Sequence, residues 1–398
     1  MQKHYFLLDN VKDWPHAGVS IVKKRNTDYV TPVDNFLSHF DEFSYRNFYN
    51  SNKDFMLDKE AYKFILHFVH MPESVDAPIA PESIAMLHNN PKAYLILMSC
   101  LECVITPKEL ASQLVRKNVP LSKVIVLCSN LEAHGKYING VYYICINFWE
   151  SYSRYHHKFL PNVPVADIDK KLEFIEHASK KFICLNRNVK PHRIWFYYAL
   201  VKQEMLDQGH VSYHLPKIHP EDYKTLSDSH WVLKRIPEAL HDDYKMSKMR
   251  KMYPRMLDKI QSDAVINYGS GIQQYYNDSL LSFVTESDNI HNFVTEKTYK
   301  AIVNLHPFFI IGNPDQHALL RSRGYHTFEH LFGSDGVMDY SQAVHMLDHI
   351  DQYDLDKLKR TIEKNYFDKL VHNYQNFFNR RVTWTGIVEE IFNAIKRT

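Results

Sequence analysis

The chain has 398 residues, of which 45% are hydrophobic and 24% are charged, a composition typical of a folded globular protein with room for two domains. Its net charge of +2 excludes a molecule that attracts polyanions through a strong overall positive field. With only 11 glycines, the chain is poorly suited to glycine-rich loops as its main device for binding nucleotides.

The five cysteines predict reduced thiols in a cytoplasmic protein, because the set is odd, sparse and placed mostly in apolar runs. Cys100 and Cys103 form a C-x-x-C pair, but no second ligand pair follows at the spacing of a zinc site. We interpret them as small buried residues at a strand end; a redox pair is the alternative.

No apolar run reaches the ~20 residues of a membrane span, and the N-terminal segment lacks the apolar core of a signal peptide. We therefore expect a soluble protein.

The first clear elements follow an aromatic-rich N-terminal stretch of about 60 residues to which we assign no structure. The apolar run Ala93–Ser99 predicts a buried strand. Thr106–Val119 predicts a helix, with Thr106 as N-cap and Pro107 at the first helical position. Lys123–Asn130 predicts a second strand. Strand, helix and strand in this order form a βαβ unit with parallel strands.

The same alternation continues through the middle of the chain. Tyr142–Phe148 predicts a strand, and the Pro- and Asp-rich segment Pro161–Asp169 predicts an inter-domain connection. Lys180–Asn188 predicts a strand with a polar exit, followed by a helix over Pro191–Gly209 with proline at its start and glycine at its end.

The second half repeats the pattern. Asn277–Ser287 predicts a strand, Thr295–His306 a helix, Pro307–Gly312 a strand and Gln316–Gly324 a helix. Residues 354–398 read as largely helical and as crossing back over the chain. We therefore predict an α/β protein with two Rossmann-like domains facing a cleft. Their boundaries are 1–165, 166–360 and a helical segment 361–398.

Two charged residues stand at the head of the helix that begins near Thr295. Helix N-termini offer unpaired N–H groups and a positive dipole end, which favour a phosphate. Lys297 would add a full positive charge, and Glu296 could accept hydrogen bonds from two vicinal hydroxyls of a ribose. The acid–base pair thus suits a nucleoside diphosphate, although a solvated helix start is the alternative.

A second group of polar residues follows the strand that begins at Lys180. Asn186, Arg187 and Arg193 lie between its carboxyl end and the next helix, where ligands of open α/β sheets bind. Arginine can grip a phosphate with two parallel hydrogen bonds. Positive charge at a helix start is unfavourable on its own, so the pattern favours an anion partner over a plain basic loop.

Two stretches, FICLNRNVKPHRIWFYYAL and LLSFVTESDNIHNFVTEKTYKAIVNLHPFFIIGNP, resemble the donor domain of α-1,3-fucosyltransferase-like glycosyltransferases. The T-E-K motif and the apolar strand that leads into Gly-x-Pro carry the resemblance. The chain is also similar to glycosyltransferases of large tailed bacteriophages. The resemblance implies a GT-B architecture, inversion at the anomeric centre and a donor site that needs no metal ion or other cofactor.

Carried over to this sequence, the resemblance implies that Arg193 and Lys297 bind the diphosphate of a nucleotide sugar and that Glu296 binds its ribose. Phe293 would lie near the nucleotide and Glu286 would line the same cleft. Asn186, Arg187 and Thr295 complete the expected donor site.

The general base of the family has no matching residue here. Inverting transfer needs a base within hydrogen-bond reach of the acceptor hydroxyl. The candidates are Glu102 and Glu132, then Asp76, and an ordinary surface carboxylate is the alternative for each.

The acceptor stays open between a hydroxymethylated base in phage DNA and a saccharide. The segment Tyr244–Lys259 is basic and interleaved with Met and Tyr, so Lys248, Arg250 and Lys251 are candidates for contacting nucleic-acid phosphates. The alternative there is a solvated amphipathic helix.

A different class also fits, namely a non-catalytic nucleotide- or DNA-binding protein on a glycosyltransferase scaffold. A phosphotransferase of the P-loop type fits less well, because the chain has no G-x-x-x-x-G-K-[ST] sequence.

Overall fold

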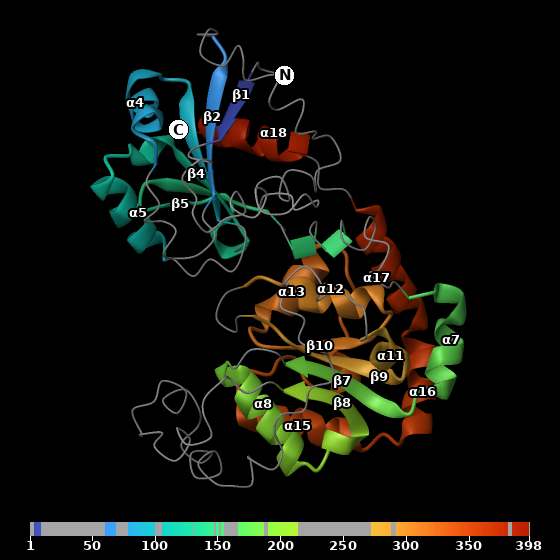
Figure 1. Ribbon diagram of the computed structural model, residues 1–398. Helices are drawn as coiled ribbons and strands as arrows, with labels where there is room; N and C mark the ends of the chain where they lie inside the picture. Colours follow the sequence, from blue (N-terminus) through green and yellow to red (C-terminus); the bar gives the residue numbers. More distant parts are fainter. Residues whose placement is uncertain are drawn as a thin grey trace, which may run out of the picture. The chain divides into compact units, whose positions relative to one another are not determined.

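The computed structural model describes residues 4–8, 60–68, 79–99, 106–129, 131–146, 149–150, 153–154, 166–186, 190–213, 272–287, 292–380 and 384–397. The chain divides into two compact units (Figure 1). One comprises Met1–Tyr152 together with Arg381–Thr398, and the other comprises Ser153–Arg380. The division after Tyr152 precedes the predicted connection, and the segment 361–398 is split between the two units.

The first unit contains a six-stranded sheet in the order β1-β2-β3-β4-β6-β5. Every pair is parallel except β5 with β6. That pair is a tight hairpin whose turn residues, Asn139 and Gly140, both have positive φ (51° and 83°), as a two-residue type I′ turn requires. The strands are β1 His4–Leu8, β2 Tyr62–Phe68, β3 Ala93–Ser99, β4 Val124–Cys128, β5 Tyr137–Ile138 and β6 Val141–Cys145.

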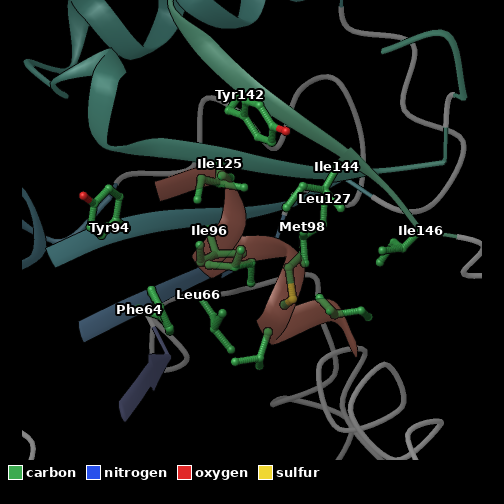
Figure 2. Close-up of a cluster of buried hydrophobic side chains, with 14 of the residues drawn as sticks. Phe64, Leu66, Tyr94, Ile96, Met98, Ile125, Leu127, Tyr142, Ile144 and Ile146 are labelled. Carbon is green, nitrogen blue, oxygen red and sulfur yellow. The ribbon is translucent and has the colours of Figure 1, made fainter. Parts of the chain in front are cut away.

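Successive side chains of these strands point to opposite faces of the sheet and pack into two separate cores, because side-chain direction in a strand repeats every two residues. One set, including Leu95 and Val126, packs against α4 and α5. The other set, including Ile96 and Leu127, packs against the C-terminal helix α18, and Figure 2 shows this second core. The helices are α4 Pro81–Asn89, α5 Pro107–Arg116, α18 Trp384–Ile395 and the short 3₁₀ turns η3 Leu121–Lys123 and η4 Leu131–Ala133.

The second unit contains a parallel sheet in the order β10-β9-β7-β8. In Figure 1, α8 and α15 lie on one face of this sheet, and α12 lies on the other. The strands are β7 Lys180–Asn186, β8 Gly209–Tyr213, β9 Ser279–Thr285 and β10 Phe308–Ile311. The helices are α7 Ile168–His177, α8 Pro191–Lys202, η5 Leu206–Gln208, α11 Gln273–Asn277, α12 Glu296–Val303, α13 Asp315–Ser322, α14 Glu329–Phe332, α15 Tyr340–Asp351, α16 Leu355–Asn365 and α17 Phe367–Asn379.

Aromatic side chains hold the helices of the second unit to its sheet. Phe283 of β9 lies 5.2 Å from Phe196 of α8, measured between ring centroids. On the other face, Tyr299 of α12 stacks on Phe377 of α17 at 5.6 Å. All four rings are fully or almost fully buried, so the first contact holds α8 against β9 and the second holds α12 against α17.

The structure confirms the predicted α/β alternation and corrects one helix. The βαβ unit is present as β3, α5 and β4, and Thr106 caps α5 by accepting a hydrogen bond from Glu109 N at 3.2 Å. The helix predicted over Pro191–Gly209 ends at Lys202, and Gly209 instead begins strand β8. None of the helices in the described ranges combines the length and apolar character that a membrane span requires.

Candidate functional site

A network of buried hydrogen bonds connects the carboxyl end of β9 to the start of α12. Glu286, the first residue after β9, has no exposed surface. Its Oε1 atom accepts from Thr295 N at 3.0 Å and from Thr298 Oγ1 at 2.6 Å. Its Oε2 atom accepts from Thr295 Oγ1 at 2.5 Å and from Ser287 N at 3.1 Å. The carboxylate therefore holds the N-terminal turn of α12 against the end of β9.

This position differs from the one expected for Glu286. The sequence places it on the wall of a nucleotide site, whereas the structure buries its carboxylate and engages both of its oxygens within the protein. A carboxylate in this setting positions its neighbours. The nearby Thr295, also fully buried, is the N-cap of α12 and accepts from Lys297 N at 3.4 Å.

Glu296 and Lys297 lie in the first turn of α12 and are half-buried. The Lys297 ammonium donates to Glu296 Oε1 at 2.8 Å, to Ser287 Oγ at 2.8 Å and to Thr295 Oγ1 at 3.2 Å. An ammonium has three N–H donors, so all three are in use. A ligand phosphate would have to take the place of one of these partners.

Glu296 is fixed in its ionised form. Burial acts to raise its pKa, but the charges of Lys297 and Lys300 and the hydrogen bond from Lys297 lower the pKa to about 2. Its side chain keeps 18% of its surface exposed. A carboxylate that is charged at every physiological pH and reachable from solvent is a pure acceptor, which suits paired hydroxyl groups.

The first turn of α8 reaches the same strand end from the other side. Arg193 Nη2 donates to the carbonyls of Thr285 at 3.2 Å and Glu286 at 3.0 Å. His192 Nε2 donates to the Glu286 carbonyl at 2.7 Å, and Lys190 Nζ donates to the carbonyl of Ser287. Arg193 is 2% exposed, so its guanidinium is largely committed to the end of β9.

The polar exit of β7 and the loop before α12 are also buried. Asn186 accepts from the Thr285 hydroxyl and donates from its amide nitrogen to Cys184 Sγ at 3.3 Å. Phe293 is 6% exposed, and its carbonyl accepts from Gln316 Nε2 at 2.8 Å. Asn186 therefore connects the ends of β7 and β9, and Phe293 connects the loop before α12 to α13.

The structure thus brings together residues that stand about 100 positions apart in the sequence. Three cationic side chains contact the segment Thr285–Ser287 at the end of β9, and two carboxylates lie beside them. The cations are Lys190, Arg193 and Lys297, and the carboxylates are Glu286 and Glu296. The site has one more formal positive charge than negative. Two helices, α8 and α12, also begin there, so their dipoles add to a positive field. Such a place is suited to an anion.

The remaining predicted site residues are placed as follows. Glu132 is exposed in η4, just beyond the carboxyl end of β4 in the first unit. Outside the described residues lie Asp76, Glu102, Arg187, Lys248, Arg250 and Lys251. In the described ranges, no three His, Cys, Asp or Glu side chains are grouped in a way that could hold a metal ion.

Sequence reasoning assigned no role to several residues of this site. Lys190 and His192 were visible as part of a basic stretch, but their partners are backbone carbonyls that no sequence pattern reveals. Ser287 and Thr298 are small polar residues without a motif, and they complete the hydrogen bonding of Lys297 and Glu286.

Comparison with known proteins gives structural neighbours only. No family model matches the chain, and no curated protein matches it. One similar structure is a glycosylation-associated protein (Gap123) complex from Streptococcus agalactiae, with a TM-score of 0.38 and 10% identity over 88% of this chain; this chain spans 57% of that one. Another is the N-terminal domain of trehalose-6-phosphate phosphatase from Candida albicans, with a TM-score of 0.42 and 9% identity over 90% of this chain and 80% of that one.

Proposed function

We propose that the chain is a glycosyltransferase that moves a sugar from a nucleoside-diphosphate sugar to an acceptor hydroxyl. The observation that carries this proposal is the meeting of Lys190, Arg193 and Lys297 at the carboxyl end of β9. Carboxyl ends of strands are where parallel sheets bind ligands. A cationic cluster there stabilises a diphosphate leaving group most strongly as its charge develops.

In this proposal each charged residue has a separate task. Lys297, whose side chain is 26% exposed, contacts the diphosphate by exchanging its hydrogen bond to Ser287 for one to a phosphate oxygen. Glu296 turns from Lys297 to the ribose hydroxyls. Arg193 contributes positive charge to the site without touching the diphosphate, because its Nη2 group donates to the carbonyls of Thr285 and Glu286. The resemblance to α-1,3-fucosyltransferase-like enzymes adds a GT-B arrangement of the two units, inversion and independence from metal ions.

The acceptor and the general base belong to the same proposal. Either a hydroxymethylated DNA base or a saccharide would supply the hydroxyl, and a carboxylate such as Glu132 or Glu102 would remove its proton. Extrusion of a base from the duplex would accompany a DNA acceptor.

A second candidate is a non-catalytic nucleotide- or DNA-binding protein. Its support is the same cationic cluster at the end of β9, which would hold a nucleotide whether or not a chemical step follows. Incubation with nucleotide sugars separates the two. An enzyme hydrolyses the donor slowly when no acceptor is present, and a pure binding protein does not.

The donor site is tested by thermal shift with UDP, GDP, ADP and their sugar conjugates, since a ligand of the folded state raises the melting temperature. The variant Lys297→Ala should lose the shift. The matched control is Lys364→Ala, which removes an exposed lysine in the last turn of α16, a residue with no part in the Lys297 site. A shift of wild-type size in Lys297→Ala would refute the assignment.

A further inference from the structure

A groove lies on the same unit, beyond the end of β10. It is an open groove of about 680 Å³, within the range of small-molecule sites. Its polar lining comes from the region around α14 and from the first turns of α15, and includes Glu329, His330, Asp335, Ser341, Gln342 and His345.

The groove stands at the carboxyl edge of the sheet. Ile311, the last residue of β10, pairs with Thr285 at the end of β9, so the two strands end level with each other. Gly312, the next residue, donates from its backbone to Val337 O at 3.2 Å, which ties the groove's loop to that end. Pro314, two residues on, lines the groove.

The direction of α15 agrees with this placement. Its last residue, Asp351, accepts from Lys181 Nζ at 3.3 Å and from Gln208 Nε2 at 2.8 Å. Both partners lie at the starting ends of β7 and β8, so the first turn of α15 points to the opposite edge. The groove therefore shares its edge of the sheet with the Lys297 site.

The charge of the groove differs from that of the Lys297 site. Two lining residues, Glu329 and Asp335, are acids, and none of the lining residues is Lys or Arg. Burial acts to raise the pKa of Glu329, but hydrogen bonds from His317 and Thr327 lower the pKa to about 2. Arg321 of α13 forms an ion pair with Glu329 and offsets its charge, so Asp335 is the lining acid that has no basic partner within the described residues. Because none of the lining residues is Lys or Arg, the groove offers no cation to a phosphate, a nucleic acid or an acidic sugar.

The hydrogen-bonding groups of the groove suit a neutral ligand. Gln342 Oε1 accepts from Met338 N at 2.7 Å, which leaves its amide NH₂ for a ligand. Within the described chain, the side chains of Asp335, Ser341 and His345 are exposed and make no hydrogen bond to protein. Carboxylate, imidazole, hydroxyl and amide groups together can both accept from and donate to the hydroxyls of a sugar. Among the lining residues there is no Phe, Tyr or Trp on which a nucleobase could stack.

We propose that this groove binds an uncharged pyranose unit, either the sugar of the donor or a saccharide acceptor. The proposal rests on the proposed function for its biological meaning, since a sugar site beside a diphosphate site is what a transferase needs. The binding itself is a separate property and is tested separately.

The test is ligand-observed saturation-transfer NMR on the full chain with methyl α-D-glucopyranoside, methyl α-D-galactopyranoside and methyl α-D-mannopyranoside. We expect at least one glycoside to bind the wild type. The double variant Asp335→Asn/His345→Ala should weaken that binding by about tenfold or more, because two polar partners are lost. Both residues are exposed, so the fold should persist. The control is Asp348→Asn, an exposed acid on the same helix that does not line the groove.

Two arms separate the sources of the sugar. If the donor sugar occupies the groove, the double variant weakens binding of UDP-glucose or GDP-mannose but leaves UDP and GDP unchanged. If an acceptor occupies it, nucleotide-sugar affinity stays at the wild-type value while glycoside binding falls. Absence of binding for all three glycosides in the wild type, or equal binding in the double variant, would overturn the proposal. Loss of nucleotide binding in Lys297→Ala bears only on the diphosphate site.

Discussion

The Glu286 carboxylate binds both the backbone N–H and the hydroxyl of Thr295, at 3.0 and 2.5 Å. The two residues are nine positions apart, and neither side chain has exposed surface. Through this pair, the segment after β9 that carries Ser287 and the helix that carries Lys297 are held in a fixed relation. The geometry around Lys297 therefore depends on a residue that need not touch a ligand.

The variant Glu286→Gln keeps the shape but replaces one acceptor oxygen by an NH₂ group. That group would face N–H or O–H donors of Ser287, Thr295 or Thr298, and buried unpaired donors cost about 1–3 kcal/mol. We expect amide hydrogen exchange in α12 to become roughly ten- to a hundredfold faster, which corresponds to that range. Glu329→Gln, the same change on α14, is the control and should leave α12 unchanged. Wild-type exchange in α12 of the Glu286 variant would contradict the positioning role.

Arg193 and Lys297 should respond differently to substitution. Arg193→Lys retains the charge, but a single ammonium cannot reproduce the guanidinium's hydrogen bonds to the carbonyls of Thr285 and Glu286 in a buried position. We expect a loss of about 2 kcal/mol in stability. Lys297→Ala removes an ion pair whose side chains keep 26% and 18% of their surface exposed. It should cost less than the Arg193 change, about 1 kcal/mol, because the Glu296 carboxylate left behind can still reach solvent. Differential scanning calorimetry measures both, and equal melting temperatures for the two variants would rule out the division of roles.

Lys171 of α7 makes the stability of the second unit depend on pH. It is 2% exposed, and burial lowers its pKa to about 7. In the unfolded chain its pKa returns to about 10.4, so between these values the unfolded state binds more protons and stability rises with pH, by up to about 1.4 kcal/mol per unit. Lys171→Met should therefore stabilise the protein below pH 7, and this gain should shrink towards pH 10.

Thermal melts from pH 6 to pH 10 check this expectation. Lys170→Met is the matched control, because this neighbouring side chain is 64% exposed and its replacement should change the profile little. A Lys171→Met protein that is less stable than the wild type at pH 6 would show that the buried ammonium has a stabilising partner.

The sequence predicted those elements whose signals are local. Thr106 and Pro107 mark the start of α5, and the apolar run of β3 has the predicted bounds. By contrast, β1 and β2 were not predicted. Strand β2 carries Lys63 and His67 in buried positions, 5% and 2% exposed, and these polar residues interrupt the apolar run that identifies a central strand.

The site shows the same division. The types of residue at the ends of β7 and β9 and at the start of α12 predicted where charged groups would gather. Their partners did not follow, because Arg193 donates to backbone carbonyls of a strand about 90 residues away. Such partners depend on how α8 packs on the sheet, and that packing arises from many weak aromatic contacts.

Gly209 shows why the predicted helix end was wrong and supplies a last prediction. It has φ of −135°, which any residue can adopt, so backbone freedom is not its purpose. A Cβ atom built on Gly209 would lie 2.3 Å from the ring of Phe182, its neighbour across the β7–β8 pair. The glycine is needed because the buried Phe182 ring, which packs on Phe283 at 4.9 Å, crosses over it. We expect Gly209→Ala to cost about 1–3 kcal/mol.

A double-mutant cycle identifies the cause of that cost. Phe182→Leu alone should destabilise the protein by creating a cavity. When Phe182→Leu is combined with Gly209→Ala, the smaller side chain leaves room for the added methyl group, so the combined variant should lose less stability than the sum of the two single changes. Since residues in contact show coupling of about 0.5–3 kcal/mol, thermal denaturation can resolve the difference. Strict additivity would mean that the ring and position 209 do not meet, and the register of β7 against β8 would then be wrong.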